Sequence, residues 1–166
     1  ILDFTNLTQE NIYVLNSPIL SNSQLEKFTS FFEKNSITID CTFDKKENLE
    51  QAIKRIQQQS EVSVRQGVTQ LILSDKNVSE EKTAIPMLLS VGAINTHLIK
   101  MKLRGYASIN AQTGEALDTH SFATLIGVGA TTVNPYLALD SLYQRFEKKL
   151  FGKFGYDECI ERFIQS

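Results

Sequence analysis

The 166-residue sequence has few of the features that define disulfide-rich, metal-binding or membrane-spanning proteins. Its two cysteines, Cys41 and Cys159, lie far apart and form no CxxC pattern, so neither a disulfide framework nor a zinc site is indicated. No apolar run approaches the roughly 20 residues that a membrane-spanning helix needs. The net charge of −2 and the lack of a basic block argue against a nucleic-acid surface. The composition predicts a soluble domain with reduced thiols and one core.

Motifs for covalent catalysis are also missing. The sequence contains no GxSxG or SxxK pattern, and it begins with Ile1 rather than a cysteine nucleophile. The two histidines, His97 and His120, lack the further ligands that a zinc site requires. Asp118 does not face His120, because residues two apart on a helix point in different directions. We therefore interpret both histidines as hydrogen-bonded structural or interface residues.

What the sequence does contain is a regular alternation of short β-branched segments and longer segments with helical spacing. It predicts strands over residues 37–43, 68–73, 106–109 and 130–133. It predicts helices from Ser21 or Ser23 to 35, then over 48–66, 85–103, 118–126 and 134–146, and a last helix from 157. Residues 110–114 are predicted to form a polar loop, and Thr8 to cap a helical turn in the segment that leads into the domain.

Four strand–helix units in succession predict an α/β fold with right-handed parallel pairing. Four such units make half of an eight-stranded barrel. Two forms fit the spacing: an open parallel sheet, or a rudimentary, incomplete TIM-like barrel with flanking helices. The apolar stripe Leu25, Phe28, Phe31 and Phe32 predicts a helix packed on the core, and so does the stripe Leu49, Ala52, Ile53, Ile56, Val62 and Val64.

Ligands in parallel α/β folds bind beyond the carboxyl ends of the strands. The residues predicted near those ends are Asp40, Cys41, Asp75, Asn110, Thr113, Glu115 and Asn134. A pair of carboxylates such as Asp40 and Asp75 can perform acid–base chemistry. The alternative is that each carboxylate caps a helix or solvates a loop, and the spacing does not pair them.

The segment Gly127-Val128-Gly129 resembles half of a dinucleotide fingerprint. A phosphate cradle, however, needs its glycines after a strand and before a helix. Here they follow a predicted helix and precede a predicted strand, which indicates a helix end with a tight return. Gly67 and Gly105 are predicted to end their helices in the same way.

Three motifs occur in the order found in one known family: SPILSNSQLEKF, then IPMLLSVGAINTHLIKMKLR, then TGEALDTHSFATLIGVGATTVNPYLAL. Together they resemble the central domain of the large subunit of glutamate synthase, over nearly the whole chain. The resemblance implies a rudimentary relative of the flavin-binding barrel, which favours the incomplete-barrel form. With Ile1 in place of an initiator Met, it also predicts a piece of a longer polypeptide.

The resemblance implies a parent enzyme that makes two glutamates from glutamine and 2-oxoglutarate and passes ammonia through an internal tunnel. Residues 1–166 would form a single domain between the glutamine amidotransferase and FMN-binding domains, with 1–20 as lead-in and 147–166 as the start of the connection onward. The parent enzyme would use FMN, an iron–sulfur cluster and NAD(P)H or ferredoxin. It would be located in the cytoplasm or a plastid, and a small electron-transfer subunit is a further implied partner. No catalytic, cofactor-binding or metal residue of the family carries over to this sequence.

Two other functions stay open at this point. The first is a self-standing α/β enzyme that acts through Asp40 and Asp75 on a phosphorylated or carboxylated metabolite. The second is an interaction module, which predicts a large exposed apolar face.

Overall fold

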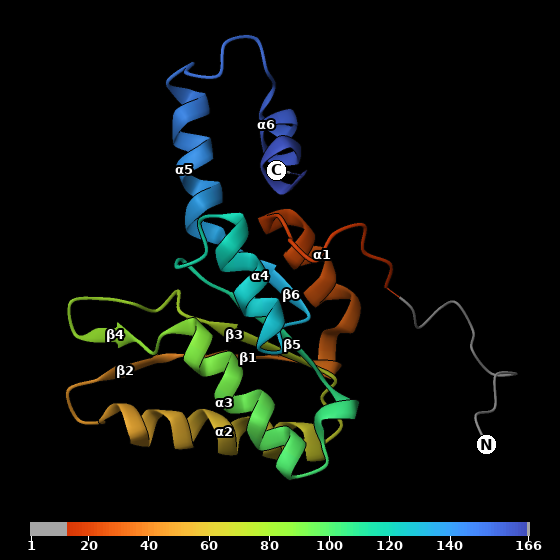
Figure 1. The fold of residues 1–166 in the computed structure, drawn as a ribbon, viewed down its shortest axis with the longest axis vertical. Helices are drawn as coiled ribbons and strands as arrows, with labels where there is room; N and C mark the ends of the chain where they lie inside the picture. The colour runs from red at the N-terminus through yellow and green to blue at the C-terminus, as the bar shows by residue number, and fades with distance from the viewer. Residues whose placement is uncertain (1–12, 166) are drawn as a thin grey trace, which may run out of the picture.

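A computed structural model describes residues 13–165, and its central feature is a four-stranded parallel sheet (Figure 1). The strands follow in the order β1 (Ser36–Asp40), β3 (Gln70–Ser74), β5 (Ser108–Gln112) and β6 (Thr132–Asn134). The helices after them are α2 (Leu49–Arg65), α3 (Met87–Lys100), α4 (Thr119–Gly127) and α5 (Tyr136–Glu147). Each strand pairs in parallel with the next one along the chain, and the sheet stays open with β1 at one edge. The predicted succession of parallel βα units is confirmed.

Local capping sets where the helices start. Asn48 caps α2 in a reciprocal capping box with Gln51, and Asp118 caps α4 by accepting from the Ser121 amide. Before the sheet, α1 (Asn22–Phe32) starts from Ser21, which forms the same kind of box with Gln24. Each cap satisfies an amide left free in the first turn and contributes about 1 kcal/mol. Ser21 and Asp118 were among the predicted starts.

One face of the sheet carries the main hydrophobic core. The register aligns Ile39, Leu73, Ala111 and Val133 in one row across all four strands, and each is almost fully buried. Because consecutive parallel crossovers have the same hand, α2, α3 and α4 pack on this same face. The core that they complete holds the sheet rigid, and with it the carboxyl ends of the strands.

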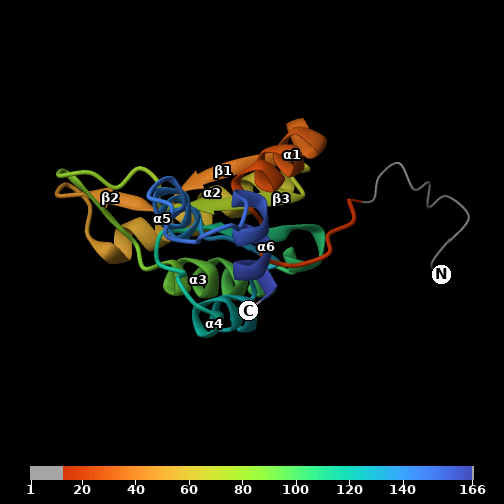
Figure 2. The same cartoon turned by 90° about the horizontal axis from the view of Figure 1, so that it is seen from above.

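The opposite face is polar, and α1 lies on that side, away from α3 and α4 (Figure 2). In one row, Ser74 donates to Gln112 at 2.8 Å and Gln112 donates to Asn134 at 3.3 Å. In the next row, Asn110 accepts from Thr132 at 2.9 Å, and it donates across to Gln70 in the following row at 3.1 Å. Within residues 13–165, no buried side-chain nitrogen or oxygen lacks a hydrogen-bond partner.

The predicted strand 37–43 is in fact two strands. It breaks at Cys41, after which β2 (Thr42–Asp44) pairs antiparallel with β4 (Lys82–Ala84), a segment for which the sequence predicted no element. The break arises because the Asp40 carboxylate accepts from both the amide and the hydroxyl of Thr42, which turns the chain.

The predicted third strand was also displaced. The structure places it at Ser108–Gln112 rather than 106–109, so part of the predicted polar loop belongs to the sheet. Tyr106 instead lies in the short 3-10 helix η4 (Arg104–Tyr106) and is 70% exposed. Polar residues occupy the strand because polar side chains of the neighbouring strands, both hydroxyls and amides, form hydrogen bonds with them, which local propensity does not register.

Glycine ends two helices as predicted, and a third ends differently. Gly67 has a φ of +95° and Gly129 one of +122°, in the left-handed region. The long helix α3 ends at Lys100 rather than near 103, because Lys102 takes a φ of +59° and reverses the chain before Gly105.

Parts of the predicted apolar stripes face solvent. Leu25 and Phe28 on α1 are buried, but Phe31 is 45% exposed; on α2, Ile56 is fully buried and Val62 is 52% exposed. Phe31 packs instead against the Tyr13 ring, 5.2 Å between centroids. A further 3-10 turn, η3 (Glu33–Asn35), links α1 to β1. The predicted turn at Thr8 lies outside the described residues.

The last two helices, α5 and α6 (Tyr156–Gln165), form an arm that projects away from the sheet (Figure 1). They pack through the Tyr156 ring, whose centroid lies 5.4 Å from that of Tyr143 and 5.6 Å from that of Phe146. The base of α6 contacts the domain where Phe163 packs edge-on against Phe122 at 5.9 Å. Among the described helices, none has the length and apolarity that crossing a membrane requires.

Candidate functional site

The carboxyl ends of β3, β5 and β6 meet around Asp75, which is only 2% exposed. Its carboxylate accepts from the Thr113 hydroxyl at 2.5 Å and from the Gly114 amide at 3.1 and 3.2 Å. Thr113 in turn donates its amide to the Asn134 carbonyl at 3.0 Å. Asp75 therefore connects three successive βα units at one point.

Tyr136 completes this cluster from the first turn of α5. Burial and a hydrogen bond with Asp75 raise the pKa of Tyr136 to about 12, so the phenol stays protonated. The Lys76 ammonium lies 5.1 Å from the centre of the same ring. A side chain at Gly114 would place its Cβ 3.1 Å from the Tyr136 hydroxyl, so the loop approaches the phenol closely.

Glu115 and His120 lie beside the cluster around Asp75, where Glu115 caps a helix and both residues line a hollow. The Glu115 carboxylate accepts from the Met87 amide at 2.8 Å and thereby caps α3. Both residues line a hollow of about 150 Å³ with Leu88, Ala116, Ser121, Thr124 and Leu125. The nearby Asp118 is engaged by Ser121, whose hydrogen bonds lower the pKa of that carboxyl. Asp118 acts as a helix cap, in line with the prediction that it does not orient His120.

Asp40 is held apart from Asp75 by its own set of partners. It accepts from Thr42 and from the Asn77 amide at 3.1 Å, and Lys82 lies 3.7 Å away. Partial burial raises the pKa of Asp40, but these hydrogen bonds outweigh it and the net pKa is lowered. Within residues 13–165 no hydrogen bond joins the two carboxylates, so the structure does not bring them together as an acid–base pair.

Cys41 lies in the core, within electrostatic reach of both acidic residues. Its side chain is fully buried, and burial raises the pKa of the thiol to about 12. A thiol that stays protonated is a poor nucleophile. Cys159 is buried and free as well.

His97 joins two helices. Its Nε2 lies 2.7 Å from the Glu61 carboxylate, which links α3 to α2, as expected of a structural histidine. Hydrogen bonds from His97 and Arg65 lower the pKa of Glu61. Across the described range, no three His, Cys, Asp or Glu side chains are grouped so that they could hold a metal ion.

Two candidate residues belong to the sheet rather than to a loop. Asn110, predicted to follow its strand, is the middle residue of β5 and 1% exposed. Asn134 ends β6, where its amide donates to the Leu20 carbonyl and to Asn22, each at 3.0 Å. Asn110 therefore ties β5 to its two neighbouring strands, and Asn134 ties β6 to the start of α1.

Sequence reasoning missed Gln70, Gln112 and Tyr136. A signal for the first two exists: polar residues stand at every second position of SINAQ and at both ends of QLILS, all on one sheet face. Tyr136 follows a predicted strand directly after Pro135, which is also a position where site residues gather.

The fold and these contacts define a class of protein: an open, parallel βα-repeat domain whose strand-end carboxylates are used to hold the fold together. Its family follows from comparison. The profile of the glutamate synthase central domain matches residues 1–166, and the chain belongs to that family.

The relatives are large chains. This chain is 43% identical over 159 residues to the glutamate synthase [NADPH] large chain of Azospirillum brasilense and 39% identical over 154 residues to that of Bacillus subtilis. The ferredoxin-dependent chloroplastic glutamate synthase of rice is 40% identical over 136 residues. These matches cover 94%, 92% and 78% of this chain but only 10%, 10% and 8% of the relatives.

A solved structure of the YdjI aldolase from Escherichia coli aligns with 88% of this chain and 63% of its own, at 11% identity and a TM-score of 0.37. A likeness this weak carries no functional argument.

Proposed function

We propose that this chain is the connecting domain of a glutamate synthase, placed between the glutamine amidotransferase domain and the FMN-binding synthase domain, and that it helps enclose the ammonia tunnel. The observation that carries the proposal is the family match over residues 1–166, in relatives of which this domain is a tenth. On this proposal residues 1–166 are a single domain, and 147–166 begin the connection to the FMN-binding domain.

The internal contacts support a geometric rather than a chemical contribution. Both Asp75 oxygens accept bonds from the chain itself, and Cys41 stays protonated. On this proposal the domain holds the two sites at a fixed separation and helps shield ammonia from water. Neither role requires the domain to react with ammonia. FMN, the iron–sulfur cluster and the electron donor would then be bound by other parts of the enzyme.

The electron donor and the compartment follow the parent enzyme. Relatives named as NADPH enzymes and as ferredoxin-dependent enzymes both contain this domain. The proposal therefore includes a small electron-transfer subunit or ferredoxin as partner, and the cytoplasm or a plastid as location.

The test uses the full-length enzyme with glutamine labelled with ¹⁵N in its amide, in the presence of excess unlabelled ammonium. In the wild type the new glutamate keeps the label, because ammonia does not exchange with solvent. Asp75→Ala frees Thr113, Gly114 and Tyr136 together, so we expect dilution of the label to rise several-fold. The control is Glu80→Ala, at an exposed carboxylate in the connection between β3 and β4, which leaves the label undiluted.

Two results would contradict the proposal. One is a label equally undiluted in wild type and Asp75→Ala, shown to be folded by its unfolding curve. The other is stoichiometric flavin binding or glutamine hydrolysis by the isolated domain, which we predict to be inert.

A further inference from the structure

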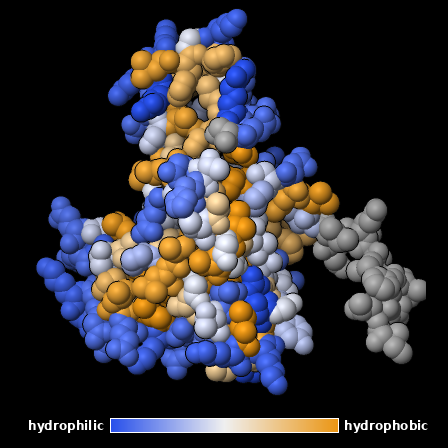
Figure 3. All heavy atoms as spheres, in the orientation of Figure 1, coloured by the Kyte–Doolittle hydropathy of each residue, from blue (hydrophilic) through white to orange (hydrophobic). Residues whose placement is uncertain are grey.

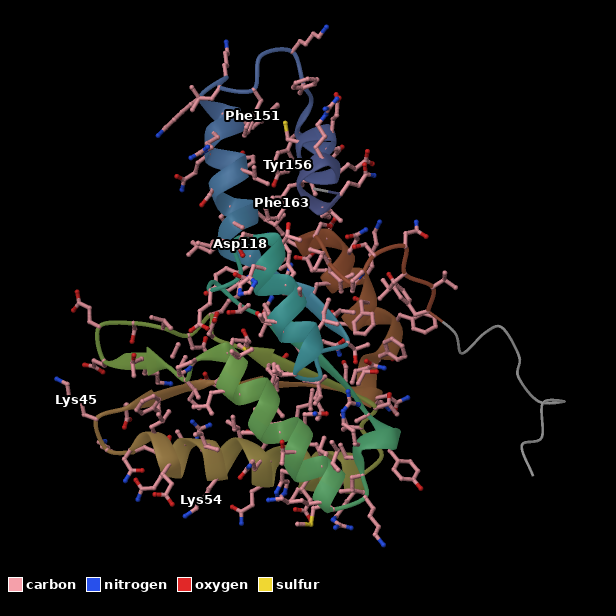
Figure 4. All side chains as sticks on the ribbon, viewed as in Figure 1. Lys45, Lys54, Asp118, Phe151, Tyr156 and Phe163 are labelled. Atoms are coloured by element: carbon pink, nitrogen blue, oxygen red, sulfur yellow. The ribbon has the colours of Figure 1, made fainter. Side chains whose placement is uncertain are left out.

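The tip of the α5–α6 arm, residues 148–155, exposes apolar side chains far from the sheet. In Figure 4 Phe151 lies at this tip, Tyr156 just below it and Phe163 at the base of the arm. The base is anchored, since Leu139 on α5 is 1% exposed and Phe163 on α6 packs against Phe122 of α4. The arm thus holds its tip in a defined position.

The tip is itself an ordered turn. The Leu150 amide donates to the Arg145 carbonyl at 3.1 Å and the Lys149 amide to the Phe146 carbonyl at 2.8 Å, the two bonds of a Schellman motif. Lys149 holds a φ of +57°, a conformation that glycine adopts more easily. In such motifs the residue at the Leu150 position frequently makes an apolar contact with the last turn of its helix. Here Leu150 remains 65% exposed.

The surface of the tip combines apolar and basic groups. Phe154 is 36% exposed, and the Arg162 guanidinium carbon lies 4.4 Å from the centroid of its ring. A hollow of about 450 Å³ is lined by Phe146, Glu147, Lys149, Phe151, Gly152, Lys153, Phe154 and Gly155. Figure 3 shows apolar residues on the arm bordered by hydrophilic ones. Residues 147–155 include three lysines and one carboxylate in a chain whose net charge is −2.

We propose that this tip docks into a recess of the same glutamate synthase chain that has an apolar floor and a rim of carboxylates. The inference rests on the proposed function, since it takes the nine-tenths of the relatives outside this domain as the source of the recess. Leu150 and the two phenylalanines supply the desolvated centre that interfaces require, and the lysines select an acidic rim. Because the turn is already formed, docking orders few side chains.

A zero-length carbodiimide cross-linker tests this on the full-length enzyme, because it joins a lysine amine only to a carboxylate in direct contact. Equal amounts of ¹⁴N and ¹⁵N enzyme are mixed before the reaction. We expect Lys148, Lys149 or Lys153 to be linked to carboxylates outside residues 1–166 within one isotopic copy. The Lys54–Glu50 pair, 2.7 Å apart, is the internal positive control. Links from the tip only to a second copy, only to a separate protein, only within 1–166, or to nothing, overturn the proposal.

A matched pair of variants gives a second readout. Trypsin cuts after the tip lysines, which docking would cover. Leu150→Asp should increase the rate of that cleavage in the full-length enzyme at least 10-fold, whereas Leu49→Asp, on the 39%-exposed first residue of α2, should leave it unchanged. Equal cleavage of wild type and Leu150→Asp would refute the docking.

These results are separable from the connecting role. Retention of the ¹⁵N label reports whether ammonia is enclosed, whereas cross-links and cleavage report where the tip lies. A retained label together with an unprotected tip would therefore refute the docking of the tip and leave the connecting role intact.

Discussion

At the residue scale, Gly129 shows how closely one turn is specified. Its carbonyl accepts from the Arg104 guanidinium at 2.9 Å, and Arg104 also donates to Asn95 at 2.7 Å. Burial lowers the pKa of Arg104, but such a guanidinium stays charged. A Cβ on Gly129 would lie 2.5 Å from the Asn95 Cγ. The glycine is therefore required by conformation and by space, in the segment that the sequence assigned to a helix end.

We predict that Gly129→Ala destabilises the domain by about 2–3 kcal/mol, because it combines left-handed strain with displacement of Asn95. The matched control is Gly92→Ala, inside α3, where no atom lies within 4 Å of the new Cβ. It should be neutral or stabilise by up to about 1 kcal/mol through helix propensity. Urea unfolding followed by circular dichroism measures both, and equal midpoints would contradict the assignment.

The carboxylates of Asp40 and Asp75 are likewise held in place by specific contacts. Both were predicted correctly to lie near strand ends, and both turn out to accept hydrogen bonds that fix loops. The partners of Asp75, Thr113 and Gly114, are almost 40 positions away, so no local pattern identifies them.

At the scale of elements, β5 carries a polar residue at every second position, and two of them bond to both neighbouring strands. Asn110 bonds to Gln70 on β3 and to Thr132 on β6, so one side chain spans three strands. A buried amide is stabilising only when its partners are in place. The polar rows therefore specify the register of the sheet, since a shift by one residue would bury unpaired amides.

We predict that Asn110→Ala costs about 2–4 kcal/mol, because Gln70 and Thr132 would lose a partner in a buried site. Thr38→Ala is its control, in the same row at the exposed edge strand β1, and should change stability by less than about 0.5 kcal/mol. A comparison of their thermal unfolding decides the point, and a cost below 1 kcal/mol for Asn110→Ala would show that the row is dispensable.

The sequence predicted the helical elements better than the strands. Capping residues such as Asn48 and Asp118 act within four positions, so their effect is visible locally. The pairing of β2 with β4 joins residues about 40 positions apart, and a three-residue strand has too short a pattern to be recognised.

At the scale of the whole molecule, stability is unevenly distributed. All residues of β3 are buried at the centre of the sheet, whereas α6 rests on α5 and touches the domain through residues such as Phe163. A segment with few buried contacts opens without unfolding the remainder.

Hydrogen exchange should therefore separate the two regions. We expect the β3 amides to exchange only through global unfolding, and the α6 amides at least 100-fold faster in the isolated domain. If α6 proved as protected as β3, the arm would belong to the same cooperative unit as the sheet.

The sequence alone determined the alternation of strands and helices, most of the caps, the glycine helix end at Gly129 and the family resemblance that the comparisons confirmed. These are local properties, or motifs long enough to be specific. Only the tertiary structure decided that the strand breaks at Cys41, that Asn110 lies inside the sheet, and that Asp75 gathers three loops. Each of these depends on hydrogen bonds between residues distant in sequence, and burial, which local propensity does not contain, gives those bonds their strength.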